Sequence, residues 1–172
     1  MKQPGLRNQH FGWGHKKATP REPKASDGKR SPRRLEELSL SELEDKLDEA
    51  VSEYVRRMAS GPGGLTRCVT CLEPSHWKEM DCGHYVSRVF RATRWNLKNL
   101  GVQCPRCNRF LGGVQHVMRA HLVKMYGEEE VRKVELEATM QGETRMDKFW
   151  MIEQIRAWRQ KLKELRKAGK GE

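Results

Sequence analysis

Two pairs of cysteines have the residue type and the spacing of a metal site. Two residues separate Cys68 from Cys71 and Cys104 from Cys107, and 32 residues lie between the pairs. Four thiolates complete the tetrahedral coordination of Zn²⁺ and leave no open position for a reacting water, so the spacing predicts one structural zinc ion per chain. The alternatives are unrelated buried cysteines or a redox pair, and the repeated Cys-x-x-Cys motif favours neither. The fifth cysteine, Cys82, is interpreted as a small packing residue.

The segment between the two pairs carries polar residues that could take part in hydrolysis. It contains Asp81-Cys82-Gly83-His84-Tyr85 and Trp95-Asn96-Leu97-Lys98-Asn99, and the second cysteine pair is followed directly by Asn108. The order His, Asn, Cys-x-x-Cys-Asn resembles the HNH nuclease pattern, in which zinc knuckles bracket a ββα-metal site. More narrowly, the sequence is similar to the phage NinG/Rap recombination-nuclease family over roughly residues 50–168. It departs from the family pattern at Val114, where Asn is usual, and at Met118, where Tyr is usual.

The resemblance implies a role for three residues in phosphodiester hydrolysis. This reaction needs a base for the attacking water and a cation that stabilises the negative charge on the phosphate and the leaving oxygen. His84 would be the general base, because a neutral imidazole accepts a proton near pH 7. Asn99 would hydrogen-bond to the backbone and keep the imidazole aimed, and Asn108 would offer its amide oxygen to Mg²⁺ or Mn²⁺. The alternative for His84 is a structural histidine or one more metal ligand.

The second protein ligand of the catalytic metal is left open by the sequence. Many HNH sites have an acid or a histidine directly before the base, where this chain has Gly83. Asp81 is the nearest carboxylate and is the candidate ligand. Residues 81 and 84 of a regular strand face opposite sides, so both would reach one ion only if the strand were kinked. Gly83 would permit a bulge there.

Six cations lie after the candidate base with no acid among them, and we expect them to form a DNA-binding groove. They are Arg88, Arg91, Arg94, Lys98, Arg106 and Arg109. Guanidinium groups suit bidentate contacts with phosphate, and clustered cations supply most of the affinity for a nucleic-acid backbone. Surface charge that only keeps the protein solvated is the alternative.

The formal net charge of +11 is unevenly distributed along the chain. Residues 1–34 contain ten Lys and Arg against two acids, residues 35–60 contain three against eight, and residues 61–127 contain ten against three. Two basic blocks separated by an acidic one indicate a partner with dense negative charge, most commonly a nucleic acid. The sequence has neither an apolar run long enough to span a membrane nor a secretory signal. We therefore expect no membrane partner and a cytoplasmic protein, in the host bacterium if a phage encodes it.

The spacing of apolar residues predicts four helices. They run from about residue 39 to 59, 114 to 126, 128 to 140 and 147 to 167. Ser39 and Glu42 have the spacing of a capping box at the start of the first helix, and Gly127 is the expected end of the second. The last helix has a heptad-like seam formed by Met151, Ile155, Trp158, Leu162 and Leu165. This seam could pack on the first helix or on its own copy in a homodimer.

The spacing of apolar residues and the cysteine pairs predict an α+β fold flanked by α-helices, and the resemblance implies that its centre is a zinc-knuckled, treble-clef-like ββα-metal (HNH) unit. Only 36% of the residues are hydrophobic, so the zinc would add stability that a small core lacks. We divide the chain into four parts. They are a disordered basic arm (1–34), a helix with a Gly/Pro linker (35–64), a zinc-stapled nuclease core (65–127) and C-terminal helices that could dimerise (128–172).

The resemblance implies a metal-dependent, structure-specific DNA endonuclease that cleaves branched recombination intermediates such as Holliday junctions and D-loops. Resolving a four-way junction needs two related cuts, which a homodimer would supply. Two alternatives stay open at this point. The chain could be an HNH nicking or packaging endonuclease that acts on duplex DNA, or a non-catalytic zinc-ribbon adaptor that binds nucleic acid with the same basic surface.

Overall fold

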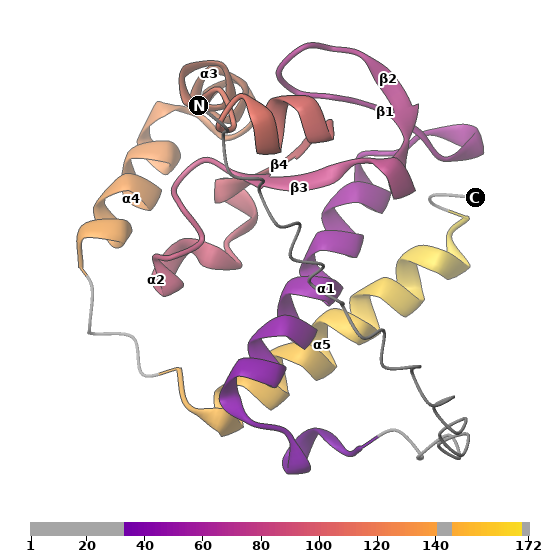
Figure 1. Ribbon diagram of the computed structural model, residues 1–172, viewed down its shortest axis with the longest axis vertical. Coiled ribbons are helices and arrows are strands. Elements are labelled where there is room, and N and C mark those ends of the chain that lie inside the picture. The colour runs from indigo at the N-terminus through magenta and orange to yellow at the C-terminus, as the bar shows by residue number, and fades with distance from the viewer. Residues whose placement is uncertain (1–32, 141–145, 170–172) are drawn as a thin grey trace, which may run out of the picture. The chain divides into compact units, whose positions relative to one another are not determined.

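The computed structural model describes residues 33–140 and 146–169, and these form a mixed α+β fold (Figure 1), as predicted. The helices are α1 (Leu40–Met58), α2 (Arg91–Arg94), α3 (Gln115–Tyr126), α4 (Glu128–Thr139) and α5 (Lys148–Lys167). The strands are β1 (Leu65–Arg67), β2 (Pro74–His76), β3 (Asp81–His84) and β4 (Leu100–Gln103). Strand β1 pairs with β2 and β3 pairs with β4, both antiparallel. The predicted basic arm lies outside the described residues except for positions 33 and 34.

Helix α1 begins at the predicted capping box. The Ser39 side chain accepts a hydrogen bond from the backbone N–H of Glu42, and the Glu42 carboxylate accepts one from the backbone N–H of Ser39 at 2.8 Å. This arrangement satisfies donors that the first turn of a helix otherwise leaves unpaired. One face of the helix then buries Leu43, Leu47 and Val51 in the main hydrophobic core.

Helix α5 covers that buried face of α1, and the two helices lie side by side (Figure 1). All five residues of the predicted seam are buried, and four of them belong to the same core cluster as Leu43 and Leu47. The seam is therefore used within the chain, as one of the two predictions had it. The expected homodimer stays a prediction.

The two hairpins carry the two cysteine pairs. The turn between β1 and β2 holds the first pair, and the second pair follows β4 and leads into a π-helical turn, η5 (Arg106–Phe110). The backbone N–H of Val69 in the first turn donates a hydrogen bond of 2.8 Å to the carbonyl of Val102 in β4. This bond joins the hairpins and brings the cysteine pairs to the same place.

Strand β3 is regular, which corrects one expectation. Its four residues pair in register with β4, from Asp81 opposite Gln103 to His84 opposite Leu100, so Gly83 does not form a bulge. A Cβ atom at Gly83 would lie 2.0 Å from Oε1 of the Gln103 side chain. Glycine is therefore needed here because Gln103 occupies the space that a side chain would fill.

Helices α3 and α4 form a second layer against the β3–β4 hairpin and its connection, with Met118, Leu122 and Val131 in a cluster of their own. Gly127 ends α3 with a φ of 90°, as predicted. Val114, just before α3, also has a positive φ, of 46°. No helix in the described part of the chain is both long and apolar enough to cross a bilayer.

Candidate metal centre and active site

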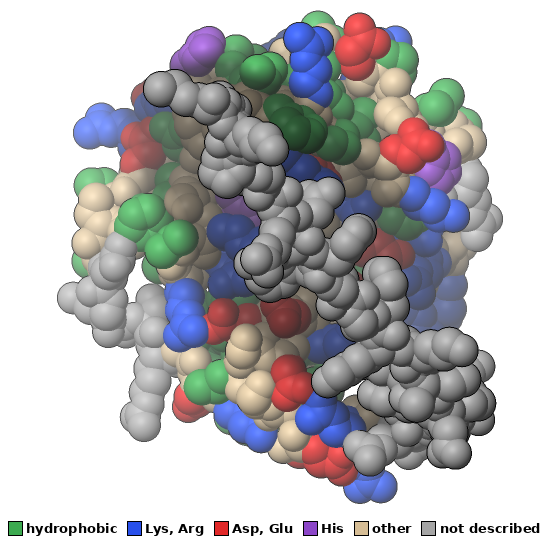
Figure 2. Space-filling view, viewed as in Figure 1, with side chains coloured by type: hydrophobic (Ala, Val, Ile, Leu, Met, Phe, Trp, Pro, Cys, Tyr) green, Lys and Arg blue, Asp and Glu red, His purple; other side chains and the backbone are tan. Residues whose placement is uncertain are grey.

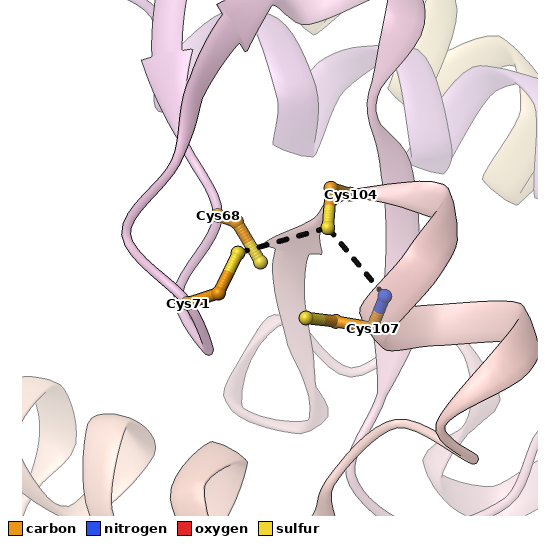
Figure 3. Close-up of side chains that lie close together, drawn as sticks. All are labelled: Cys68, Cys71, Cys104 and Cys107. Atoms are coloured by element: carbon orange, nitrogen blue, oxygen red, sulfur yellow. Dashed lines mark hydrogen bonds between the residues drawn. The ribbon is translucent and has the colours of Figure 1, made fainter.

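The four paired cysteines converge on one point (Figure 3). Their Sγ atoms all lie within 4.8 Å of one another, and the Sγ atoms of Cys71 and Cys104 are 3.8 Å apart. Within residues 33–140 and 146–169, no other group of three or more His, Cys, Asp or Glu side chains is gathered so closely. The cluster could therefore hold a metal ion such as zinc, which prefers four sulfur ligands in a tetrahedron.

The thiol chemistry of the cluster suits a cation. Burial opposes ionisation of Cys68, but hydrogen bonds from the backbone N–H groups of Cys71, Cys104 and Thr70 lower its pKa to about 7. Burial and the neighbouring sulfur atoms raise the pKa of Cys107 instead. The Cys68 thiolate thus forms readily, and Cys107 resists adding negative charge beside it. A divalent cation removes that resistance, because it stabilises all four thiolates at once.

His84, the candidate base, ends β3 and lies on the side of the strand that faces α1. Its Nε2 atom is 3.1 Å from the backbone carbonyl oxygen of Arg94. A carbonyl oxygen only accepts hydrogen bonds, so Nε2 carries the ring proton and Nδ1 keeps its lone pair. The ring is thereby held in the tautomer that offers Nδ1 as a proton acceptor.

The His84 side chain lines a pocket of about 340 Å³ between α1, the hairpin and the connection that follows β3. Charged residues of both signs surround it: Asp45, Asp48, Glu49, Arg88 and Arg94. Burial lowers the pKa of His84 below its usual range, and the Arg94 carbonyl and the Asp48 carboxylate only partly oppose this. The ring is therefore neutral at pH 7, the form that can accept a proton.

Asn99 is completely buried at the end of the connection between β3 and β4. Its Oδ1 accepts a hydrogen bond of 2.6 Å from the backbone N–H of Val86, and its Nδ2 donates to the carbonyls of Val86 and Thr93, both at 3.0 Å. These bonds tie together the start and the middle of the connection, from which the Arg94 carbonyl projects. Asn99 thus bonds to the backbone, as expected. Its predicted role in keeping the His84 ring aimed for a reaction stays a prediction.

The two candidate ligands of a catalytic metal, Asp81 and Asn108, are in contact with each other. The Asn108 side-chain amide lies 3.1 Å from Oδ2 of Asp81, and Arg109 donates two further bonds to Asp81, at 2.7 and 2.5 Å. Burial favours the neutral carboxyl, but these bonds hold the pKa of Asp81 below its usual range. Because β3 is regular, Asp81 and His84 face opposite sides of the strand. The structure therefore does not bring the candidate base to the face of the candidate metal ligands.

Five of the six predicted DNA-binding cations have acidic partners. The ion pairs are Arg88–Asp48, Arg91–Glu44, Arg94 with both Glu44 and Asp48, Lys98–Glu130 and Arg109–Asp81. On the face shown in Figure 2, Lys and Arg side chains accordingly lie among Asp and Glu side chains.

The paired cations differ in how much of each side chain a phosphate could reach. The Arg94 side chain is only 10% exposed, so the assignment of Arg94 to a DNA contact is wrong, and this residue is an internal anchor. The side chains of Arg88, Arg91 and Arg109 are more than half exposed, and that of Lys98 is 42% exposed. Arg106 is also exposed.

Glu44 and Asp48 are parts of the site that the sequence analysis missed. Both lie on α1, one helical turn apart, beside the buried face formed by Leu43 and Leu47. Acids four residues apart repel one another on an isolated helix. Two such acids beside an apolar stripe indicate that a cation from elsewhere in the chain packs against them. In this protein that cation is Arg94.

The chain is similar to known proteins of one phage family. The model of the NinG family, described as "Bacteriophage Lambda NinG protein", matches residues 7–169. "Protein ninG" of Escherichia phage lambda is 30% identical over 106 residues, which are 58% of this chain and 47% of that protein. The chain thus spans about half the length of this curated relative. No solved structure matches the chain significantly.

Proposed function

The chain belongs to the NinG family, and from that premise we propose that it is a metal-dependent endonuclease of the HNH (ββα-metal) class that cleaves branched DNA. Three features support this class. A β3–β4 hairpin is followed by a helical turn, four cysteines bracket the unit, and a histidine and an asparagine stand at the hairpin end and on the turn. The observation that carries the proposal is the bond between His84 and the Arg94 carbonyl, because it leaves a buried, neutral imidazole with a free acceptor nitrogen.

In the proposed reaction His84 acts as the general base. Its Nδ1 atom accepts a proton from a water molecule, the water oxygen bonds to phosphorus, and the bond between phosphorus and the leaving oxygen breaks. The leaving oxygen takes its proton from solvent. The lowered pKa of His84 keeps the ring in its accepting form over a wider pH range than an exposed histidine would allow.

A divalent cation such as Mg²⁺ or Mn²⁺ would supply charge stabilisation at the phosphate when it is bound. Asp81 and Asn108 fit this role in donor chemistry, since an ionised carboxylate and an amide oxygen are hard ligands. Two protein ligands are enough for Mg²⁺, which keeps several waters. Because these residues face away from His84, an ion between them would not lie beside a phosphate in the His84 pocket, and the base and the metal ligands are therefore tested separately.

Branched DNA is proposed as the substrate on the strength of the family resemblance, and the homodimer on the need for two related cuts. The exposed cations Arg88, Arg91, Arg106 and Arg109 would contact phosphates. Of these, Arg88 is best placed to hold a phosphate near the base, because it lines the His84 pocket. Contact with DNA would exchange its 3.4 Å ion pair with Asp48 for a phosphate.

The test is cleavage of a labelled four-way junction and of a matched linear duplex, with Mg²⁺, Mn²⁺ or EDTA. His84→Ala should bind junction DNA normally and lose about 10²–10⁴-fold in cleavage rate. Asn108→Ala should lose activity that added Mn²⁺ partly restores, because its defect is in metal affinity. His116→Ala, a change to an exposed histidine on α3, is the matched control and should leave the rate unchanged.

The pH dependence gives a second readout. The neutral ring is the base, so wild-type activity should fall as the pH drops through the pKa of His84, with a midpoint below the ordinary value of about 6.5. Full activity of His84→Ala would refute the nuclease mechanism and favour a zinc-containing DNA-binding adaptor. Equal cleavage of junction and duplex would refute the preference for branched DNA and leave a duplex nuclease.

A further inference from the structure

The Asp48 carboxylate of α1 is bonded to two consecutive residues of the β3–β4 connection. Its Oδ1 accepts hydrogen bonds from Nε of Arg94 at 3.0 Å and from the indole Nε1 of Trp95 at 2.8 Å, and its Oδ2 accepts from Nη2 of Arg94 at 2.5 Å. The side chains of Arg94 and Trp95, which flank one peptide group, are therefore both bonded to the Asp48 carboxylate. The carbonyl of that same peptide group accepts the hydrogen bond from His84.

This anchor belongs to the rigid part of the molecule. Asp48 lies in the middle of α1, next to Leu47, which is fully buried against α5. Trp95 is itself 8% exposed and packs in the same core. The Asn99 side chain holds the same connection through the carbonyls of Val86 and Thr93, and Glu44 accepts a further bond from the Arg94 guanidinium. Asp48 thus fixes the Arg94 carbonyl relative to helix α1 and the hydrophobic core.

We propose that Asp48 is a positioning residue for His84. It fixes the Arg94–Trp95 peptide so that the Arg94 carbonyl holds the His84 ring with Nε2 protonated and Nδ1 free. This inference deepens the proposed function and rests on it for the consequence in catalysis, but the effect on the ring is a property of the folded protein alone. Groups that orient a metal-bound histidine through its second ring nitrogen change metal affinity or activity by about 10–100-fold when removed, and we expect a loss of the same order here.

The charges around His84 define the proper control. Asp45, Asp48 and Glu49 face the pocket from α1, Arg88 and Arg94 face it from the connection, and the Cys82 thiol faces it from β3. Asp45 lines the same pocket and carries the same charge as Asp48, but it is exposed, and the hydrogen bonds of Arg94 and Trp95 go to Asp48 and Glu44. Asp45→Asn therefore removes a charge without removing the anchor, whereas Asp48→Asn removes both.

The first experiment reads the ring directly, in the zinc-loaded full-length chain. Nitrogen-15 NMR of the imidazoles reports which ring nitrogen carries the proton and follows the pKa of His84. Wild type should show one tautomer with Nε2 protonated. Asp48→Asn should show a mixture of tautomers, because its amide presents N–H groups to the guanidinium of Arg94 and cannot accept three bonds. Asp45→Asn should keep the single tautomer.

The second experiment measures cleavage of a four-way junction. Asp48→Asn should lower kcat by about 10–100-fold, while its DNA affinity should not fall, because the change also frees Arg88 from its ion pair with Asp48. Asp48→Glu keeps the charge but lengthens the side chain, so it should recover only part of the rate. If Asp48→Asn does not fold, a partial loss of kcat together with a partial mixture of tautomers in Asp48→Glu tests the positioning role. Asp45→Asn, which keeps the anchor, should retain a kcat well above that of Asp48→Asn.

The outcomes separate this inference from the proposed function. A single Nε2-protonated tautomer in Asp48→Asn, or the same tautomer mixture in Asp45→Asn, would overturn the positioning role whatever the protein cleaves. If wild type and Asp48→Asn differ in tautomer as expected but wild type cleaves no DNA, the proposed nuclease activity would be overturned. The positioning of the His84 ring by Asp48 would still hold.

Discussion

Val114 holds a backbone conformation that valine avoids, and replacing it should stabilise the protein. Its φ of 46° and ψ of 62° lie in the left-handed region, and its side chain makes no capping bond to α3. For L-residues this region costs roughly 1–2 kcal/mol, and branching at Cβ makes it worse. Asn tolerates the region better and glycine has no Cβ to clash. Asn is also the residue that the family pattern has at this position.

The size of the effect follows from two opposing contributions. Relief of the backbone should return about 1–2 kcal/mol, while loss of the half-buried valine side chain should remove about 1 kcal/mol. A polar side chain at the start of α3 adds up to about 1 kcal/mol. We therefore expect Val114→Asn to raise the free energy of unfolding by about 1 kcal/mol, which is roughly 2–4 °C in Tm for a chain of this size.

The assay is thermal and urea unfolding of the zinc-loaded protein. Comparing Val114→Gly with Val114→Ala shows whether the backbone at residue 114 is strained. Val114→Gly should be more stable than Val114→Ala by about 1 kcal/mol, because alanine keeps the Cβ. At Val89, an exposed residue without a positive φ, the order should be reversed. If Val114→Ala proved more stable than Val114→Gly, the backbone argument would be wrong.

Two further predictions concern the zinc and the arm. Cys104→Ser should lose the metal and the cooperative unfolding transition together, since binding and folding are linked, and zinc analysis with calorimetry checks this. A zinc-free protein that melts at an unchanged temperature would contradict it. Deleting residues 1–32 removes eight Lys and Arg and spares the ion pair of Arg33 with Glu42. DNA affinity should fall and its salt dependence should flatten, with the cleavage rate at saturating protein unchanged; an unaltered salt slope would count against this role.

The helices and the metal cluster could be predicted from the sequence because their signals are local. The capping box at Ser39, the glycine stop at Gly127 and the paired cysteines each depend on residues a few positions apart. The partner of α5 could not be decided in the same way. A heptad-like seam has the same pattern whether it packs on α1 or on a second copy, and only the fold shows that it packs on α1.

The surroundings of His84 could not be predicted, because they depend on pairs that are far apart in the sequence. The neighbours of Arg94 in the chain place it among the DNA-binding cations, whereas its partners Glu44 and Asp48 lie 50 and 46 positions away. Burial against opposite charge converts such an arginine from a binding residue into an anchor. Acids of the block 35–60 pair with arginines of the basic block inside the fold. The net charges of the two blocks therefore indicate how the protein could meet DNA only when these internal pairs are taken into account.

Gly83 gives the last prediction, since a glycine within a strand indicates either a bulge or a close approach. The close approach is the Gln103 side chain, which is fully buried and donates to Oγ1 of Thr70 at 2.6 Å and to the carbonyl of Gly113 at 2.7 Å. These bonds join the first cysteine turn to the loop after the second, so Gln103 cannot move aside without breaking them. Gly83→Ala should therefore cost about 1–3 kcal/mol of stability. The added cost should vanish when Gln103 is already alanine, because the clash is then gone. Urea unfolding of both single variants and of the double variant measures this coupling, and strictly additive changes would show that Gln103 is not the reason for the glycine.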